Sequence, residues 1–183
     1  MSLPSPVTLY EQASARAVEI VEGIRPDQLS SPTPCSAWTV QDLLDHLVGG
    51  TRYLGGAISG SPLEAPAGAT AADYRAGRDR CLAALQAPEV LSRTCLSPLG
   101  FEWTVVEATA GTFMDTLVHT WDLATATGQQ ADLDPQLVDA CTEMFLPEMP
   151  ERGRAAGLIG PAVTVGDGAT PQDRLLGAMG RQP

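Results

Sequence analysis

Histidine is the scarcest chemically versatile residue in this chain, which carries two, His46 and His119, among 183 residues. His119 follows Asp115 by four residues, a spacing that places both side chains on one face of a helix. His46 lies in a separate segment, and if the two segments pack as helices it can meet Asp115 and His119 in the interior. Two imidazoles and one carboxylate are a standard ligand set for a divalent transition metal with open coordination positions. His46, Asp115 and His119 are therefore the candidate metal ligands.

A purely structural interpretation of the same residues stays open from the pattern alone. Acids are 22 of the 183 residues, so an aspartate four residues before a histidine often arises by chance. The polar stripe that contains the pair consists of Thr112, Asp115, His119 and Asp122. It is also compatible with the solvent-facing side of an amphipathic helix. In that interpretation Asp122 is a solvated acid or an acceptor for an N–H group.

Apolar residues at three- and four-residue spacing predict the helices that would position these groups. The predicted helices cover about residues 6–24, 39–59, 70–86, 104–127, 134–145 and 170–178. Thr39 and Asp42 predict a capping box at the start of the helix that carries His46, with Trp38 and Leu43 as its hydrophobic staple. The helix that carries Asp115 and His119 is apolar on more than one face, which is typical of a central helix in a bundle.

The remaining segments predict little regular structure. Pro98–Gly100 is typical of a turn, with short extended pieces on both sides. Residues 151–169 are expected to form a loop or short strand, with Val163–Val165 as the β-like run. The predicted fold is all-α, an up-and-down four-helix bundle with an extra C-terminal segment of short strand and helix. Without an internal repeat or a break in composition, residues 1–183 are expected to form one domain.

The charge balance limits the classes of partner. The chain has 22 acidic and 11 basic residues, a formal net charge of −11, and every basic residue is an arginine. The absence of lysine excludes Schiff-base and P-loop lysine chemistry from this sequence. An acidic surface repels nucleic acids and anionic membranes, so neither is expected as a partner.

The cysteines and the N-terminus indicate the compartment. Cys35, Cys81, Cys95 and Cys141 are far apart and are expected to be reduced, small hydrophobic residues. The N-terminus lacks the pattern of a secretory signal. No apolar stretch approaches the roughly 20 residues that span a membrane. The protein is therefore expected to be cytoplasmic.

Three segments resemble the DinB/YfiT-like family of metal-binding four-helix bundles. They are TPCSAWTVQDLLDHLVG at residues 33–49, DTLVHTWDLA at 115–124 followed by Thr127-Gly128, and the tail QDRLL at 172–176 with GRQP at 180–183. Within the family they are most similar to the actinobacterial branch that resembles the N-terminal domain of mycothiol-dependent maleylpyruvate isomerase. The resemblance implies a four-helix bundle that holds a metal through His46 and the acid-x-x-x-His pair Asp115 and His119. The isomerase usually has glutamate where this chain has Asp115, so the metal is expected to lie closer to that helix or to bind more weakly.

The resemblance also implies a chemistry. The cofactor would be a divalent transition metal, zinc or nickel, with mycothiol as thiol co-substrate and a small electrophile as the other partner. The function would be that of a metal-dependent thiol S-transferase or isomerase-like enzyme. The alternatives are a non-catalytic metal- or ligand-binding bundle, and a metal-dependent hydrolase that uses the same ligands. The larger isomerase has a C-terminal domain that this chain is expected to lack, so isomerase activity itself is not implied. A homodimer paired through a helical face is compatible with the family.

Overall fold

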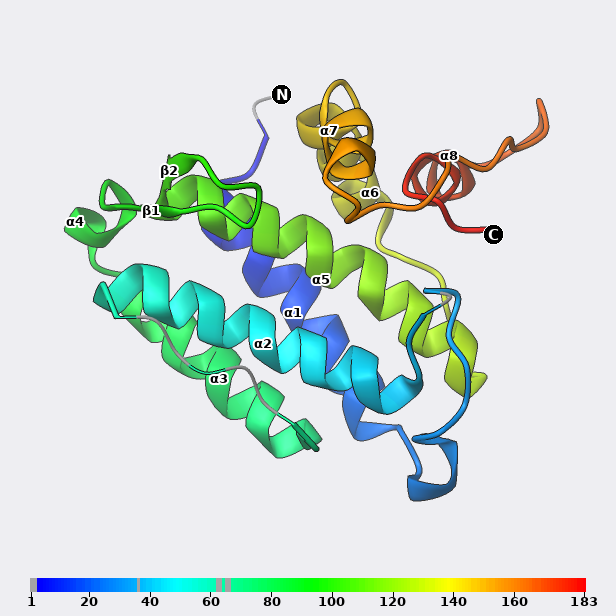
Figure 1. Ribbon diagram of the computed structural model, residues 1–183, viewed down its shortest axis with the longest axis horizontal. Helices are drawn as coiled ribbons and strands as arrows, with labels where there is room; N and C mark the ends of the chain where they lie inside the picture. Colours follow the sequence, from blue (N-terminus) through cyan, green and yellow to red (C-terminus); the bar gives the residue numbers. More distant parts are fainter. Residues whose placement is uncertain (1–2, 36, 62–63, 65–66) are drawn as a thin grey trace. The chain divides into compact units, whose positions relative to one another are not determined.

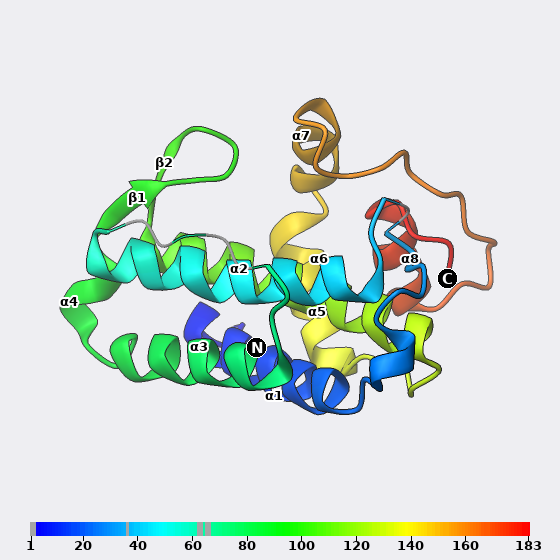
Figure 2. The same ribbon diagram turned by 60° about the horizontal axis from the view of Figure 1, so that its bottom comes forward.

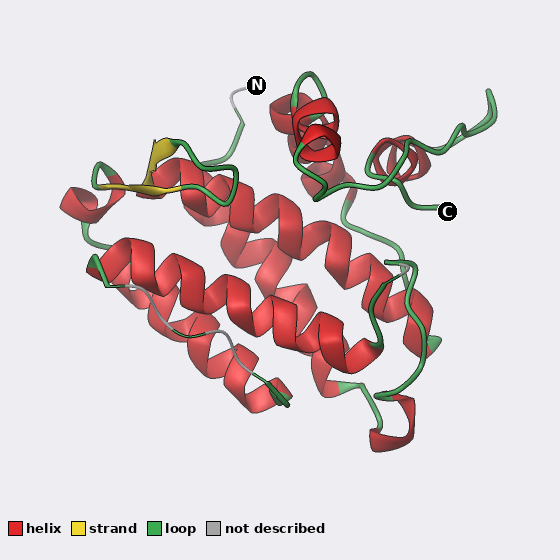
Figure 3. Ribbon diagram, in the orientation of Figure 1, coloured by secondary structure: helices red, strands yellow, loops and turns green. Residues whose placement is uncertain are grey.

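The computed structural model describes residues 3–35, 37–61, 64 and 67–183, and most of them are helical (Figures 1 and 3). By their internal contacts they divide into two compact units. We call residues 4–131 the N-terminal unit; residues 132–183, together with Leu3, are the C-terminal unit. That the two units form one domain stays a prediction.

The elements of the N-terminal unit are α1 (Pro6–Glu22), η1 (Pro26–Gln28), α2 (Val40–Ser59), α3 (Ala71–Ala84), α4 (Pro88–Leu91), β1 (Thr94–Leu96), β2 (Glu102–Thr104) and α5 (Val105–Thr127). Those of the C-terminal unit are α6 (Pro135–Phe145), α7 (Met149–Ala155) and α8 (Pro171–Ala178). In the C-terminal unit, α6 packs against α8.

The four long helices of the N-terminal unit form a bundle. Helix α5 packs against α1 and α2, and α3 packs against α2 and α1 (Figure 2). Side chains from all four of these helices meet in the core, among them Ile20 of α1, Leu43 and Leu47 of α2, Tyr74 of α3 and Leu123 of α5. The predicted all-α class and four-helix bundle are confirmed.

Local sequence signals fix the ends of the helices. The predicted capping box is confirmed at α2, where the Thr39 side chain accepts from the Asp42 N–H and the Asp42 carboxylate accepts from the Thr39 N–H. Capping boxes of the same kind begin α3, α5 and α8. Helix α5 ends at Gly128, whose φ of 69° lies in the left-handed region that favours glycine. These signals set the rotation and length of the two helices that carry the candidate ligands.

Between α3 and α5 the chain forms a small hairpin. Strands β1 and β2 pair antiparallel, with Cys95 opposite Trp103. This confirms the predicted turn at Pro98–Gly100 and its extended flanks. The hairpin passes directly into α5, because Thr104 ends β2 and is also the N-cap of the helix.

The C-terminal unit differs from its prediction in two places. The expected loop or strand contains a helix over Met149–Ala155, because Pro150 lies in its first turn, where the missing N–H of proline costs nothing. Val163–Val165 is not a strand. The Val163 N–H donates to the carbonyl of Gly177 in α8, so the run lies along a helix instead of pairing with a second strand.

Among the described residues, no helix combines the length and the apolar character that a membrane span requires.

Candidate metal centre

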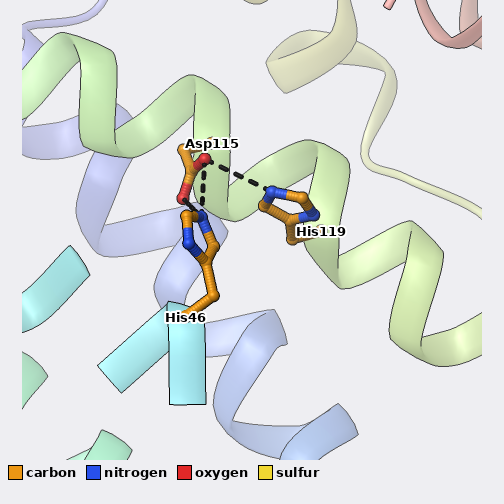
Figure 4. Close-up of side chains that lie close together, drawn as sticks. All are labelled: His46, Asp115 and His119. Carbon is orange, nitrogen blue, oxygen red and sulfur yellow. Dashed lines mark hydrogen bonds and ion pairs between the residues drawn. The ribbon is translucent and has the colours of Figure 1, made fainter. Parts of the chain in front are cut away.

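Two helices bring the three predicted ligands together. Helix α2 carries His46, and α5 carries Asp115 and His119 (Figure 4). His46 Nε2 lies 3.1 Å from Oδ1 and 3.0 Å from Oδ2 of Asp115. His119 Nε2 lies 3.4 Å from Asp115 Oδ1. One ligand atom from each residue lies within 4.8 Å of the other two, and no other such group of three occurs among the described residues.

The polar stripe of α5 faces the interior of the N-terminal unit. Thr112, His119 and Asp122 are buried, and 32% of the Asp115 side chain is exposed. The buried threonine hydroxyls of the helix donate to carbonyls four residues earlier, as Thr112 does to Ala108 and Thr120 does to Thr116. The interpretation of this stripe as a solvent-facing surface is therefore wrong.

Asp122 fixes the orientation of His119. Its side chain is fully buried, and His119 Nδ1 donates to its Oδ2 over 2.8 Å. Because this bond occupies Nδ1, the other ring nitrogen, Nε2, is directed toward Asp115 and His46. A carboxylate behind a histidine ligand is a common means of setting the tautomer and the ring orientation at metal sites. Of the two expectations for Asp122, the solvated acid is wrong because the residue is buried, and the acceptor for an N–H group is confirmed, with His119 as the donor.

The three side chains perturb one another's protonation. Burial by itself raises the pKa of Asp115, but the charges and hydrogen bonds of His46 and His119 outweigh it and hold this pKa well below its ordinary value. Burial lowers the pKa of His119, but the charge of Asp115 and hydrogen bonds to Asp115 and Asp122 raise it to about 9. In the absence of a metal the site is thus an ion pair of an aspartate and a protonated histidine.

Trp38, predicted as a hydrophobic staple, packs against the core and also lines this site. The centroid of its ring lies 4.6 Å from that of His46 and 5.7 Å from that of His119. Its backbone is held by a hydrogen bond from its N–H to the Cys35 carbonyl and by two from Thr33 to its own carbonyl. Trp38 precedes the N-cap Thr39, so helical spacing from His46 does not place its ring, and the sequence carries no separate signal for this contact.

The cysteines take no part in the cluster. None of these four described cysteines is in a disulfide; Cys81 and Cys141 are buried, while Cys35 and Cys95 are half-buried. Burial raises the pKa of Cys81 to about 11 and that of Cys141 to about 12. The two buried cysteines are thiols at neutral pH, which confirms them as small hydrophobic residues, whereas Cys35 and Cys95 are more exposed than expected.

Comparisons with known proteins agree on one family. The profile of the mycothiol maleylpyruvate isomerase N-terminal domain matches residues 10–124, a range that includes all three candidate ligands. Proteins from two strains of Mycobacterium tuberculosis, both named as uncharacterized, are 39% identical over 140 residues, which cover 72% of this chain and 72% of each relative.

Two crystal structures are also similar, one of the mycothiol-dependent maleylpyruvate isomerase and one of a histidine-to-alanine mutant of it. Each matches with a TM-score of 0.50 and 14% sequence identity over 73% of this chain. The match spans 65% of the isomerase's own length. At this identity the likeness shows the shared fold.

Proposed function

Because the chain belongs to the family of mycothiol maleylpyruvate isomerase N-terminal domains, we propose that it binds a divalent transition metal, zinc or nickel, and uses it to activate a small thiol. His46, Asp115 and His119 would hold the metal. The thiol would be of the mycothiol type. It would either be transferred to a small electrophile or catalyse a rearrangement of that electrophile.

The observation that carries this proposal is the convergence of three ligand atoms from two helices within 4.8 Å. The donor set fits the group, because two imidazole nitrogens and one carboxylate oxygen suit zinc and nickel. The hydrogen bond from His119 Nδ1 to Asp122 supports it further, since it leaves Nε2 to face the metal. Three protein ligands would leave coordination positions for another molecule.

The residues of the site have distinct roles in this proposal. A divalent metal at this point lowers the pKa of a coordinated thiol, so that the thiolate is available at neutral pH. Asp115 supplies the negative charge that favours a cation over the protons that the site otherwise holds. Asp122 keeps the His119 ring in place, and Trp38 limits the access of water on one side of both imidazoles.

Metal analysis of the purified protein tests the first step. Wild-type protein should hold one equivalent of zinc or nickel, and His46→Ala and His119→Ala should each lose it. Tyr53→Phe, a change on α2 outside the cluster, is the matched control and should retain the metal. Stoichiometric metal in both histidine variants would refute the assignment of the ligands.

Thiol consumption tests the second step. The metal-loaded protein should accelerate the loss of free thiol in the presence of an electrophile, and chelation should abolish this rate. Bound metal without any thiol-dependent rate would reduce the function to metal binding.

A further inference from the structure

We infer that a molecule bound to the metal extends between α2 and α5 toward the β1–β2 hairpin, over Gly50, and that the Trp103 indole limits its length. This inference rests on the proposed metal site. It names the place of the ligand within the N-terminal unit and the residue that selects ligands by size.

An open space lies beside the metal ligands on α2. Gly50 follows His46 by four residues, which places it one turn farther along the helix and about 40° around it. On the helical wheel it lies between His46, which contacts α5, and Leu47, which is in the core. A Cβ built at Gly50 nevertheless meets no atom of the described residues within 4 Å, and the residue is half-buried. A position that faces the neighbouring helix thus borders unfilled space one turn from the ligands.

The hairpin closes this space at its far end with one indole ring (Figure 1). Trp103 Nε1 donates to the hydroxyl of Tyr53, which follows His46 by seven residues on nearly the same face of α2. The six-membered ring of the same indole lies over Gly111 of α5, where a Cβ would come within 2.7 Å of it. The indole therefore bridges the two helices that carry the ligands.

Helix geometry sets the length of the space. Tyr53 lies about 10 Å along α2 from His46, and Gly111 lies about 6 Å along α5 from Asp115. Both lengths run from the ligands toward the hairpin, because Trp103 contacts Tyr53 and Gly111 together. An extended chain advances roughly 1.2 Å per bond. A ligand chain of about five bonds therefore fills the shorter length and reaches the indole.

The two glycines that face this space have different explanations. Glycine in a helix interior is less favourable than alanine by about 1 kcal/mol, so each position needs a reason. At Gly111 the reason is the close approach of Trp103. At Gly50 no described neighbour comes close enough to exclude a side chain. A ligand that lies over Gly50 supplies the missing reason.

Cobalt-loaded protein tests the length limit, because thiolate binding to Co²⁺ gives a charge-transfer absorption band. We would titrate it with 2-mercaptoethanol, 4-mercapto-1-butanol and 6-mercapto-1-hexanol, which differ only in length. The four-carbon thiol should bind about tenfold more tightly than the two-carbon thiol, because two further methylene groups are removed from water. The six-carbon thiol should bind no more tightly than the four-carbon thiol. A steady rise through all three thiols, or no dependence on length, would overturn the limit.

Filling the space should block it without removing the metal. Gly50→Leu should retain cobalt and bind 4-mercapto-1-butanol at least about tenfold more weakly than the wild type, since its side chain occupies the place of the two methylene groups. Gly49→Leu is the matched control, because it makes the same change 100° around α2 and should keep the wild-type affinity. Equal affinities for this thiol in the two variants would contradict the location over Gly50.

Removing the indole should lengthen the space. In Trp103→Ala, 6-mercapto-1-hexanol should bind about tenfold more tightly than 4-mercapto-1-butanol, whereas in the wild type it does not. Phe101→Ala is the control, because it removes the ring packed edge-on against Trp103 in the same hairpin but leaves the indole. A loss of hairpin stability alone does not reverse the order of affinities with length. If Trp103→Ala kept the wild-type order, the indole would not set the limit.

A nitrogen ligand separates this inference from the thiol chemistry. 1-Butylimidazole binds the metal through its free ring nitrogen, and shifts of the cobalt d–d bands report its affinity. If no thiol binds but Gly50→Leu binds 1-butylimidazole more weakly than Gly49→Leu does, the thiol chemistry fails and the location of the ligand stands. Equal affinities for 1-butylimidazole in the two variants would overturn the location, and failure to take up cobalt would overturn both proposals.

Discussion

Two clusters of aromatic and polar side chains lie along the contact of α2 with α5, one toward the hairpin end and one toward the other end, and their polar atoms are bonded in opposite ways. At the hairpin end, Trp103 Nε1 donates to the Tyr53 hydroxyl over 2.7 Å, and that hydroxyl donates to the Leu96 carbonyl over 3.0 Å. The Trp103 ring lies over Gly111, where a Cβ would come within 2.7 Å of it. The polar atoms of this cluster satisfy one another and join the hairpin to the bundle.

At the other end the polar groups are held from the interior and left accessible on the outside. Asp122 fixes His119 from within, while 35% of the His46 side chain and 32% of the Asp115 side chain are exposed. His46 Nε2 is hydrogen-bonded to both carboxylate oxygens of Asp115 (Figure 4), and a metal could replace these hydrogen bonds. The two clusters thus differ in function. The one at the hairpin completes the fold, whereas the one with the ligands remains able to bind a metal.

The largest effect should come from removing the charge at the accessible end. Asp115→Asn keeps the size of the side chain but removes the anionic ligand, and zinc affinity should fall by more than about 100-fold, or about 2.7 kcal/mol. Competition with a chromophoric chelator measures it. Glu11→Gln, the same change of charge at an exposed position of α1, should leave the affinity unchanged. Equal affinities in the two variants would remove the distinction between the two ends.

The next effect should come from the residue behind the ligands. Asp122→Asn can still accept from His119 Nδ1 but without a charge, and loss of such a partner typically weakens metal binding 10- to 100-fold. The same chelator competition applies, and nickel should show the same order of variants as zinc. If Asp122→Asn bound zinc as tightly as wild type, the buried carboxylate would have a role in folding alone.

Much of the fold follows from local signals in the sequence. Thr39 with Asp42 and Gly128 set the ends of α2 and α5 by local hydrogen bonding and backbone preference, so a short window of sequence contains them. Apolar spacing predicts the helices for the same reason. The helix over Met149–Ala155 was not predicted, because a proline such as Pro150 can either end a helix or begin one, and the choice depends on residues outside the window.

The site was only partly predictable. The pairing of Asp115 with His119 is local, but the meeting with His46 depends on how α2 packs against α5. The role of Asp122 depends on its burial, which a polar stripe does not reveal, because threonines that donate to their own helix allow such a stripe to face the core. Trp38 both packs against the core and lines the site, and the staple position in the sequence predicts only the first of these contacts.

The stability of the metal-free protein should depend on pH through His119. Folding raises the pKa of His119 from 6.5 to about 9, so the folded state holds this proton more tightly than the unfolded state. The stabilisation is therefore complete below about pH 6.5 and is lost as the pH rises through about 9, a loss of about 3 kcal/mol. Urea unfolding in the presence of a chelator, from pH 6 to 10, measures it. His119→Gln should flatten this part of the curve, and an unchanged curve in that variant would assign the dependence to other groups.

The smallest effect should come from the closed end. Tyr53→Phe removes the hydroxyl that accepts from Trp103 and donates to Leu96, but all three residues are at least partly exposed, so water can replace part of what is lost. Unfolding should cost about 1 kcal/mol less, while zinc affinity stays at the wild-type value. Asp122→Asn should have its main effect on metal affinity. Measuring the free energy of unfolding and the zinc affinity in both variants therefore separates the functions of the two ends. Weaker zinc binding in Tyr53→Phe would mean that the hairpin end also positions the ligands, because α2 and α5 would then transmit a change in one cluster to the other.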